Sequence, residues 1–251
     1  MIARRGLIGA GLGGLLLAGC DRVSTAPAVQ DFIGRSEGLT RRAQRILLAG
    51  QPLAREFSAR DISPVFKANG SQTPTSDAYA HLLAGGFADW RLTVDGLVAA
   101  PMSFSLAELR AMPTRTQITR HDCVEGWSAI GGWTGVPLAH VLQRTGLQAD
   151  ARYLVFHCAD NLGGAGDNGL YYESIDLFDA FHPQTILAYG MNGGALPVAH
   201  GAPLRLRVER QLGYKQAKYV MRIEATDRLG GIHGGRGGFW EDRGYAWYAG
   251  I

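Results

Sequence analysis

The segment from Thr119 to Leu138 constrains the fold more than any other part of the chain. It sets one thiol, Cys123, among an imidazole, two carboxylates and an indole, between a strand-like run at 116–119 and a helix-like run at 137–147. This mixture is poor material for an ordinary core, and a thiolate is a ligand for soft or high-valent transition metals. Taken alone, Cys123 is more often a buried core thiol, because free cysteine is among the most buried residue types.

The rest of the chain predicts more strands than helices, without regular alternation between them. This order favours an α+β fold with mixed sheets and surrounding helices over a doubly wound sheet. A hairpin is predicted at 90–98, with its turn at Asp95-Gly96. Other predicted strands are 153–158, 185–189, 204–208 and 219–226, and other predicted helices are 39–48, 105–112 and 173–181.

The first 20 residues predict export rather than a part of the fold. Arg4-Arg5 precedes an uncharged run at 6–19 that is short for a membrane span. The paired arginines indicate twin-arginine export, and Leu17 to Cys20 resembles a lipobox in which Cys20 is lipidated. We therefore expect a periplasmic protein anchored by Cys20 to the inner membrane; an uncut N-terminal anchor is the alternative. Residues 21–56 are predicted to form a linker, at 21–30, and the short helix.

The composition is that of a globular protein. Hydrophobic residues make up 46% of the chain and charged residues 19%, far from the disordered class. The net charge is only +3, and no basic stripe interleaved with aromatic residues is present, so nucleic acid is not an expected partner. The glycine-rich run at 163–169 lacks the Lys-Ser/Thr of a P-loop.

Three motifs in one order carry a family resemblance. They are Cys-Val-Glu-Gly-Trp at 123–127 followed by Gly-Trp-Thr-Gly-Val-Pro-Leu at 132–138, His-Gly-Ala-Pro-Leu-Arg-Leu at 200–206, and Gly-Tyr-Lys-Gln-Ala-Lys-Tyr-Val at 213–220. Together they resemble the sulfite-oxidase family of molybdopterin-dependent oxidoreductases, in the branch of periplasmic methionine-sulfoxide reductases. The resemblance covers about residues 62–227, and the predicted domain is 57–229.

The resemblance implies a molybdenum-molybdopterin cofactor with Cys123 as the protein's metal ligand. It also implies that Glu125 is an acidic catalytic residue beside the metal, where a carboxylate can move protons. An arginine offers a planar fork of donors that matches phosphate oxygens, which suits Arg205 to the phosphate end of the pterin. The cofactor-binding residues implied by the resemblance are Asn69, Gln72, Thr73, Cys123, Cys158, His200, Arg205, Gln216, Ala217 and Lys218.

Some of these positions have an ordinary alternative. Cys158 stands where the reductases have a threonine and His200 where they have an asparagine; Cys158 also fits a buried strand cysteine. Glu125 also fits a surface loop. The nearby His121 and Asp122 fit a hydrogen-bonded structural pair as well as an active-site role.

The phosphate-loop resemblance at 213–218 also has an alternative. Its two lysines, Lys215 and Lys218, fit charged residues that protect an exposed strand edge. In an oxidising compartment Cys123 and Cys158 could pair, but the resemblance argues against a disulfide, because Cys123 is needed as a thiolate.

The expected activity is a two-electron redox reaction, with oxygen-atom transfer to or from a small-molecule oxide or oxyanion. Glu125 lies where a carboxylate would repel sulfite, which favours reduction of a neutral S- or N-oxide. The alternatives are sulfite-dehydrogenase-like oxidation, a non-catalytic periplasmic binding protein and, more weakly, a thiol enzyme. Electrons are expected from a membrane haem protein or a small cytochrome. The aromatic tail at 230–251 is predicted to pack on the domain, where it could line a substrate funnel or a partner surface.

Overall fold

The computed structural model describes residues 26–50, 52–163 and 169–251. The predicted signal at 1–20, its Cys20 and the residues up to position 25 lie outside this part of the chain. The chain divides into two compact units, one ending at Gly50 and the other beginning at Gln51. The second unit contains the predicted domain at 57–229 together with the tail.

The first unit contains one described helix, α2 (Pro27–Leu47). It begins well before the predicted start at residue 39, so the expected linker does not extend to residue 30. Proline fits the first helical turn, because its fixed backbone angle suits the helix and its missing N–H is not needed there. Among the described residues, no helix is both long and apolar enough to cross a membrane.

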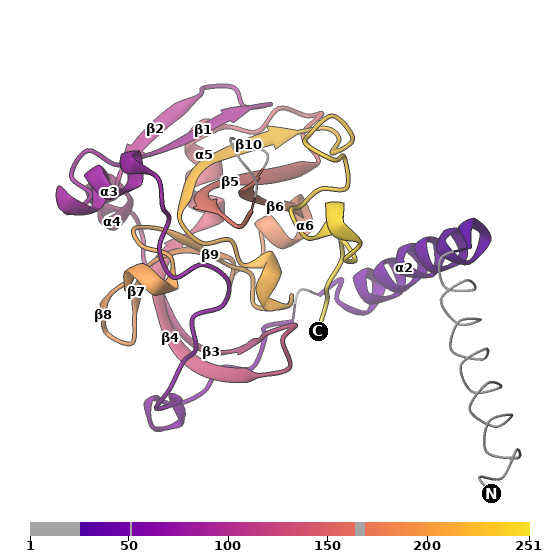
Figure 1. Ribbon diagram of the computed structural model, residues 1–251, viewed down its shortest axis with the longest axis horizontal. Coiled ribbons are helices and arrows are strands. Elements are labelled where there is room, and N and C mark those ends of the chain that lie inside the picture. Colours follow the sequence, from indigo (N-terminus) through magenta and orange to yellow (C-terminus); the bar gives the residue numbers. More distant parts are fainter. Residues whose placement is uncertain (1–25, 51, 164–168) are drawn as a thin grey trace, which may run out of the picture. The chain divides into compact units, whose positions relative to one another are not determined.

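The second unit contains ten strands and several short helices among the residues that the structure describes (Figure 1). In chain order the elements are η1 (Ala59–Asp61), α3 (Asp77–Ala84), β1 (Arg91–Gly96), β2 (Met102–Ser105), α4 (Leu106–Ala111), β3 (Arg115–Asp122), β4 (Ser128–Pro137), α5 (Leu138–Thr145), β5 (Tyr153–Asn161), β6 (Leu170–Asp176), α6 (Leu177–Ala180), β7 (Ile186–Met191), β8 (Gly194–Ala195), η3 (Val198–His200), β9 (Arg205–Arg207), η4 (Gly213–Lys215), β10 (Val220–Thr226) and η5 (Glu241–Arg243).

The strands form two sheets, and in neither do they follow simple chain order. The first has the order β2-β1-β10-β5-β6, in which β1 and β10 run parallel and the other neighbours run antiparallel. The second has the order β3-β4-β7-β8, with β9 also paired to β7. Because β1 and β10 are the one parallel pair among the described strands and all the other neighbours run antiparallel, this arrangement confirms the predicted α+β class and excludes a doubly wound sheet.

The larger of two buried hydrophobic clusters among the described residues joins the two sheets. Leu92 and Phe156 of the first sheet belong to the same buried cluster as Leu187 and Leu206 of the second. Helix α5 adds its buried face to this cluster, and α4 is fixed at its start by a capping box between Ser105 and Glu108, as predicted. The strand ends and loops around this core hold the polar side chains of the site.

The predicted turn at Asp95-Gly96 is wrong, because both residues belong to β1. The hairpin between β1 and β2 turns later, at 97–101. Gly96 has a φ of +80° and lies so close to the neighbouring strand β10 that a Cβ would overlap the backbone of Ala225. The glycine is therefore explained by the close approach of two strands and not by a turn.

The helix predicted at 173–181 is also wrong over its first half. Residues 170–176 form strand β6, and only Leu177–Ala180 is helical. Both faces of this strand are buried, including the polar Glu173 and Ser174, so the simple alternation of a half-exposed strand is missing from the sequence. Strand β4, rich in glycine, was not predicted at all.

Candidate active site

Cys123 lies in the tight loop that joins β3 to β4. The Cys123 amide donates to the Trp127 carbonyl at 2.9 Å, and the Gly126 amide donates to the Cys123 carbonyl at 3.0 Å. Gly126 has a φ of +85°, which other residues rarely adopt. The loop holds a thiol that is only 8% exposed, and burial raises its pKa above the ordinary value. Cys123 and Cys158 are both free thiols in this fold.

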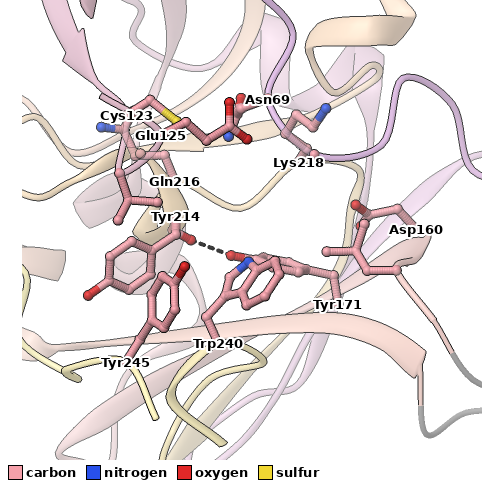
Figure 2. A pocket seen from close by; sticks show the side chains of 14 residues that line it. Asn69, Cys123, Glu125, Asp160, Tyr171, Tyr214, Gln216, Lys218, Trp240 and Tyr245 are labelled. Carbon is pink, nitrogen blue, oxygen red and sulfur yellow. Dashed lines mark hydrogen bonds between the residues drawn. The ribbon is translucent and has the colours of Figure 1, made fainter. Parts of the chain in front are cut away.

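A pocket opens beside this thiol (Figure 2). Cys123 and Glu125 lie on one side of it, and the rings of Tyr214, Trp240 and Tyr245 lie on the opposite side. The lining comprises Asn69, Gly70, Cys123, Val124, Glu125, Asp160, Leu162, Tyr171, Gly213, Tyr214, Gln216, Lys218, Trp240 and Tyr245. Five of the predicted site residues thus line one pocket: Asn69, Cys123, Glu125, Gln216 and Lys218.

The carboxylate of Glu125 is oriented by its neighbour in the loop. The Trp127 indole N–H donates to Glu125 Oε2 at 2.9 Å. The Trp127 ring in turn packs edge-on against Phe66, with ring centroids 6.0 Å apart. Glu125 is therefore an exposed residue whose carboxylate has a fixed partner at the pocket wall, in contrast to a freely solvated loop glutamate.

Arg205 lies behind the pocket and is completely buried. Its guanidinium donates to the His200 carbonyl at 3.2 Å and approaches Asn69 Oδ1 at 3.5 Å, while its Nε has no described partner. Among the described residues, no carboxylate lies within ion-pair distance of it. Burial and the neighbouring Arg207 lower the pKa of Arg205 to about 9. Burial, with Arg205 and Lys218 nearby, also lowers the pKa of His200 to about 4.

Arg207, which the sequence did not single out, forms an ion pair with a neighbouring carboxylate. Its Nη2 donates to Glu209 Oε2 at 2.6 Å and its Nε to Glu209 Oε1 at 3.0 Å. Arg205 and Arg207 both lie over the Trp133 ring, at 5.2 and 4.2 Å from its centroid. Residues two apart on a strand share a face, so the spacing of these arginines was the available signal.

His121 and Asp122 have separate structural partners. His121 is fully buried behind the loop, with Nδ1 3.0 Å from Arg207, and burial keeps its pKa well below the ordinary value. Asp122 accepts hydrogen bonds from Arg120 at 2.9 Å and Ser128 at 2.5 Å. Neither residue lines the pocket, so they support the Cys123 loop from behind and do not form a pair.

Lys218 and Asp160 face the pocket beside Ser71. Lys218 donates to the carbonyls of Ser71 and, at 3.0 Å, Ala199; burial and Arg205 lower its pKa to about 7. One carboxylate oxygen of Asp160 accepts a hydrogen bond from the Ser71 hydroxyl at 2.8 Å. The other oxygen has no described partner. Burial raises the pKa of Asp160 to about 6. The sequence signal for Asp160 was a charged residue at the end of a buried strand.

These residues fit a phosphate-bearing metal cofactor. The described residues contain no group of three His, Cys, Asp or Glu side chains that could hold a metal, so a metal at Cys123 needs ligands from elsewhere. Molybdopterin supplies sulfur ligands of its own. A buried guanidinium without a carboxylate, together with Lys218 and an unpartnered His200 Nδ1, offers donors and positive charge for its phosphate.

The other predicted residues lie outside the pocket lining. Gln72 and Thr73 are exposed, and the Thr73 hydroxyl reaches only the Pro74 carbonyl. Cys158 is buried beside a separate cavity and contacts the Phe156 carbonyl at 3.8 Å. Ala217 is buried with its carbonyl bonded to the Leu206 amide at 2.8 Å.

The interpretation of Lys215 as an exposed edge residue is wrong. Its side chain is completely buried between Glu173 and Glu241. It does not line the pocket either, although it belongs to the loop that resembles a phosphate-binding loop. By contrast, Trp240 and Tyr245 of the tail line the pocket. The composition of the tail does not predict which of its aromatic residues do so.

Comparison with known proteins agrees with this geometry. Residues 81–230 match the family described as the oxidoreductase molybdopterin binding domain. The chain belongs to this family. Its cofactor is molybdenum-molybdopterin, and its fold is the sulfite-oxidase type, as the resemblance implied.

Two relatives and one solved structure show which members of the family this chain is similar to. The chain is 44% identical over 163 residues to a putative protein-methionine-sulfoxide reductase subunit, YedZ1, of Azospira oryzae, covering 65% of this chain and 56% of the relative. It is 38% identical over 146 residues to the protein-methionine-sulfoxide reductase catalytic subunit MsrP of Ralstonia nicotianae, covering 55% and 44%. The sulfane dehydrogenase SoxCD of Paracoccus pantotrophus matches with a TM-score of 0.50 and 26% identity, over 56% of this chain and 39% of that one. The chain thus spans about half the length of these relatives.

Proposed function

We propose that this protein reduces an organic sulfoxide, with a methionine sulfoxide as the first candidate, or a related N-oxide. The observation that carries the proposal is the fixed carboxylate of Glu125 beside Cys123, facing a wall of aromatic rings across the pocket. A carboxylate at this place repels an anion such as sulfite and can deliver a proton to a neutral oxide. The relatives named as methionine-sulfoxide reductases support the same choice.

The overall reaction converts a sulfoxide, two protons and two electrons into a thioether and water. When bound, molybdenum-molybdopterin would supply the two-electron redox chemistry of oxygen-atom transfer. Cys123 would be the protein's ligand to that metal, and Arg205 with Lys218 would hold the phosphate. Glu125 would hold a proton on its carboxylate, oriented by Trp127, and release it to the departing oxygen.

The aromatic wall would receive the organic part of the substrate. Trp240 and Tyr245 stack with ring centroids 5.3 Å apart, and Tyr214 meets Tyr245 edge-on at the same distance. Rings of this kind attract the thioether sulfur of the product by about 0.3–1.5 kcal/mol, and they exclude water from the reacting atoms. A bulky organic oxide therefore suits this pocket better than an inorganic oxyanion.

The proposal includes a second chain and a membrane location. The relatives are called a subunit and a catalytic subunit, which supports a partner that delivers electrons; we propose a membrane haem protein or, less directly, a small cytochrome. Arg4-Arg5, the apolar run and Cys20 support twin-arginine export to the periplasm and a lipid anchor at Cys20. Fractionation of cells that express the native protein and Cys20→Ala tests the anchor. Native protein found free in the periplasm would exclude it.

The activity test uses purified protein loaded with cofactor. With a reduced viologen dye as the electron donor, we expect turnover of methionine sulfoxide and other organic sulfoxides. Glu125→Gln should lower kcat by about 10²–10⁴-fold, because a positioned proton donor is lost, while the bound pterin stays at the native level. Trp127→Phe is the matched variant, which keeps the carboxylate and removes only its partner, and should have a smaller effect.

The second candidate is oxidation of an inorganic sulfur compound, favoured by the match to a sulfane dehydrogenase. Turnover of sulfite or a sulfane with ferricyanide, without turnover of any organic oxide, would replace the first proposal. Protein without stoichiometric molybdenum and pterin after expression in a cofactor-producing host would favour a non-catalytic binding protein.

A further inference from the structure

Lys215 occupies an unusual position in the cofactor-binding loop. It lies between Tyr214 and Gln216, which line the pocket, yet its own side chain is 0% exposed and outside the lining. Its ammonium group is bonded to Glu173 of β6 and, at 2.5 Å, to Glu241 of η5. The loop is therefore tied to two other elements on the side away from the cofactor-binding residues.

The segment 238–251 holds the same loop by its backbone as well. The Tyr214 hydroxyl donates to the Ala246 carbonyl at 2.7 Å, and the Leu212 amide donates to the Ala249 carbonyl at 3.0 Å. The Ile251 amide donates to the Arg210 carbonyl at 3.0 Å. Residues 210–215 are thus bonded to this segment at several successive points, besides the ion pair.

The segment is also fixed to the first sheet. The Phe239 amide donates to the Tyr172 carbonyl at 3.0 Å, and the Trp247 indole N–H donates to the Ser174 hydroxyl at 2.8 Å. Figure 1 shows this segment, in yellow, running beside β6. Because one end of each contact lies on a strand of the core, the segment connects the cofactor loop to the rigid part of the domain.

The charges at Lys215 make the connection strong and specific. Two carboxylates face one ammonium, all nearly inaccessible to water. Burial, together with Glu241, raises the pKa of Glu173 well above its ordinary value. Burial alone would lower the pKa of Lys215, but the two carboxylates outweigh it and raise that pKa. A protonated Glu173 leaves an ionised pair between Lys215 of the loop and Glu241 of the segment.

We propose that the segment 238–251 is a clamp that retains molybdopterin, and that Lys215 and Glu241 are its positioning residues. The clamp holds the loop 213–218 in the shape that binds the cofactor, and it closes one wall of the pocket with Trp240 and Tyr245. Loss of the clamp shortens the time that the cofactor stays bound. The proposal depends on the identity of the cofactor but not on the substrate or the direction of the reaction.

The test measures cofactor release from the purified holoenzyme. Glu241→Gln removes the charge of the segment's partner. Gly238→Ala adds a methyl group that would overlap the Glu241 carboxylate. We expect both variants to release pterin at least about tenfold faster than the native protein. This corresponds to a fall of about 1.4 kcal/mol or more in the activation free energy of release. Glu224→Gln, a half-buried carboxylate paired with Arg222 on β10, is the matched control and should release pterin at the native rate.

A second measurement separates positioning from general stability. Cofactor binding raises the unfolding midpoint of the holoenzyme above that of the pterin-free protein. If the clamp positions the loop, Glu241→Gln narrows the gap between the two midpoints. If Glu241 only stabilises the fold, both midpoints fall together, the gap stays unchanged and the proposal is wrong. If Glu241→Gln does not fold, Gly238→Ala decides by the same two measurements, and native release from a folded Gly238→Ala protein overturns the proposal.

Discussion

Arg205 and Lys215 are two completely buried cations on neighbouring parts of the chain, and their surroundings are opposite. Lys215 has two carboxylates within bonding distance, whereas among the described residues the hydrogen-bond partners of Arg205 are a carbonyl and an amide oxygen. A buried charge without a counter-charge costs several kcal/mol, so a fold retains one only where it serves a purpose. We therefore propose that Lys215 stabilises the scaffold and that Arg205 binds an anionic ligand.

The largest effect is expected at Lys215. Lys215→Met leaves Glu173 and Glu241 facing each other without a cation, and breaking a buried pair in this way costs about 3–5 kcal/mol. Urea unfolding of the pterin-free protein measures this loss. The double variant Lys215→Met, Glu241→Gln also removes the Glu241 charge that the single variant leaves unpaired, and should recover a large part of the lost stability. A single variant as stable as the native protein would end the assignment of Lys215 to the scaffold.

Arg205 should behave in the opposite way. In the pterin-free protein Arg205→Met removes an uncompensated charge, so the free energy of unfolding should stay the same or rise. Pterin binding should weaken by about 2–5 kcal/mol, because the phosphate loses its charged partner. Arg205→Lys keeps the charge but loses the planar fork, so its pterin affinity should lie between those of the native protein and Arg205→Met. Urea unfolding of the pterin-free protein tests the prediction on stability, and the amount of bound pterin tests the prediction on binding. An Arg205→Met protein that is destabilised but keeps the native pterin content would contradict the assignment of Arg205 to an anionic ligand.

Lys218 is the intermediate case, with carbonyl partners and with Asp160 nearby. Burial lowers its pKa from 10.5 to about 7, so between these pH values the unfolded chain binds more protons than the folded one. Stability of the pterin-free protein should therefore rise with pH over this range. Asp160 acts in the other direction, because burial raises its pKa from 3.8 to about 6 and stability should fall with rising pH between these values.

Lys218 and Asp160 together contribute a stability minimum between pH 6 and 7 to the pterin-free protein, whereas His200, whose pKa is lowered from 6.5 to about 4, contributes a rise of stability with pH between these values. Relative to the native protein, Lys218→Met should flatten the alkaline rise and Asp160→Asn should flatten the acid fall; because each charge shifts the pKa of the other, each variant also moves the titration of the group that remains. Unfolding midpoints measured from pH 4 to 10 check this. An alkaline rise that persists in Lys218→Met would show that another group causes it.

The sequence predicted the parts of the site that rest on local pattern. The family resemblance of the three motifs implies that Cys123, Glu125, Gln216 and Lys218 belong to one site, and all four line one pocket. The capping box at Ser105 was equally legible, because its two hydrogen bonds join residues three apart. In each case the determining contacts lie within a few residues or within a motif.

The misread parts depend on partners far away in the sequence. Glu173 resembles an exposed residue of an amphipathic helix, but in the fold it is buried on β6 against Lys215 and the segment 238–251. Gly96 resembles a turn glycine until Ala225 of β10 lies beside it. Trp240 and Tyr245 belong to a segment that is held near the pocket by the Lys215–Glu241 bond together with hydrogen bonds to β6 and to residues 210–214. A single sequence carries no local signal for such pairings.

We propose, as the central claim about this site, that Cys123 is the protein's ligand to the metal and that Arg205 holds the phosphate of the cofactor. X-ray absorption at the molybdenum edge, on the native holoenzyme and on Cys123→Ser, tests this directly. We predict one sulfur neighbour fewer around the metal in Cys123→Ser, with the bound pterin close to the native amount because Arg205 and Lys218 still hold it. The same number of sulfur neighbours in both proteins would contradict the assignment of Cys123 and, with it, the account of the site.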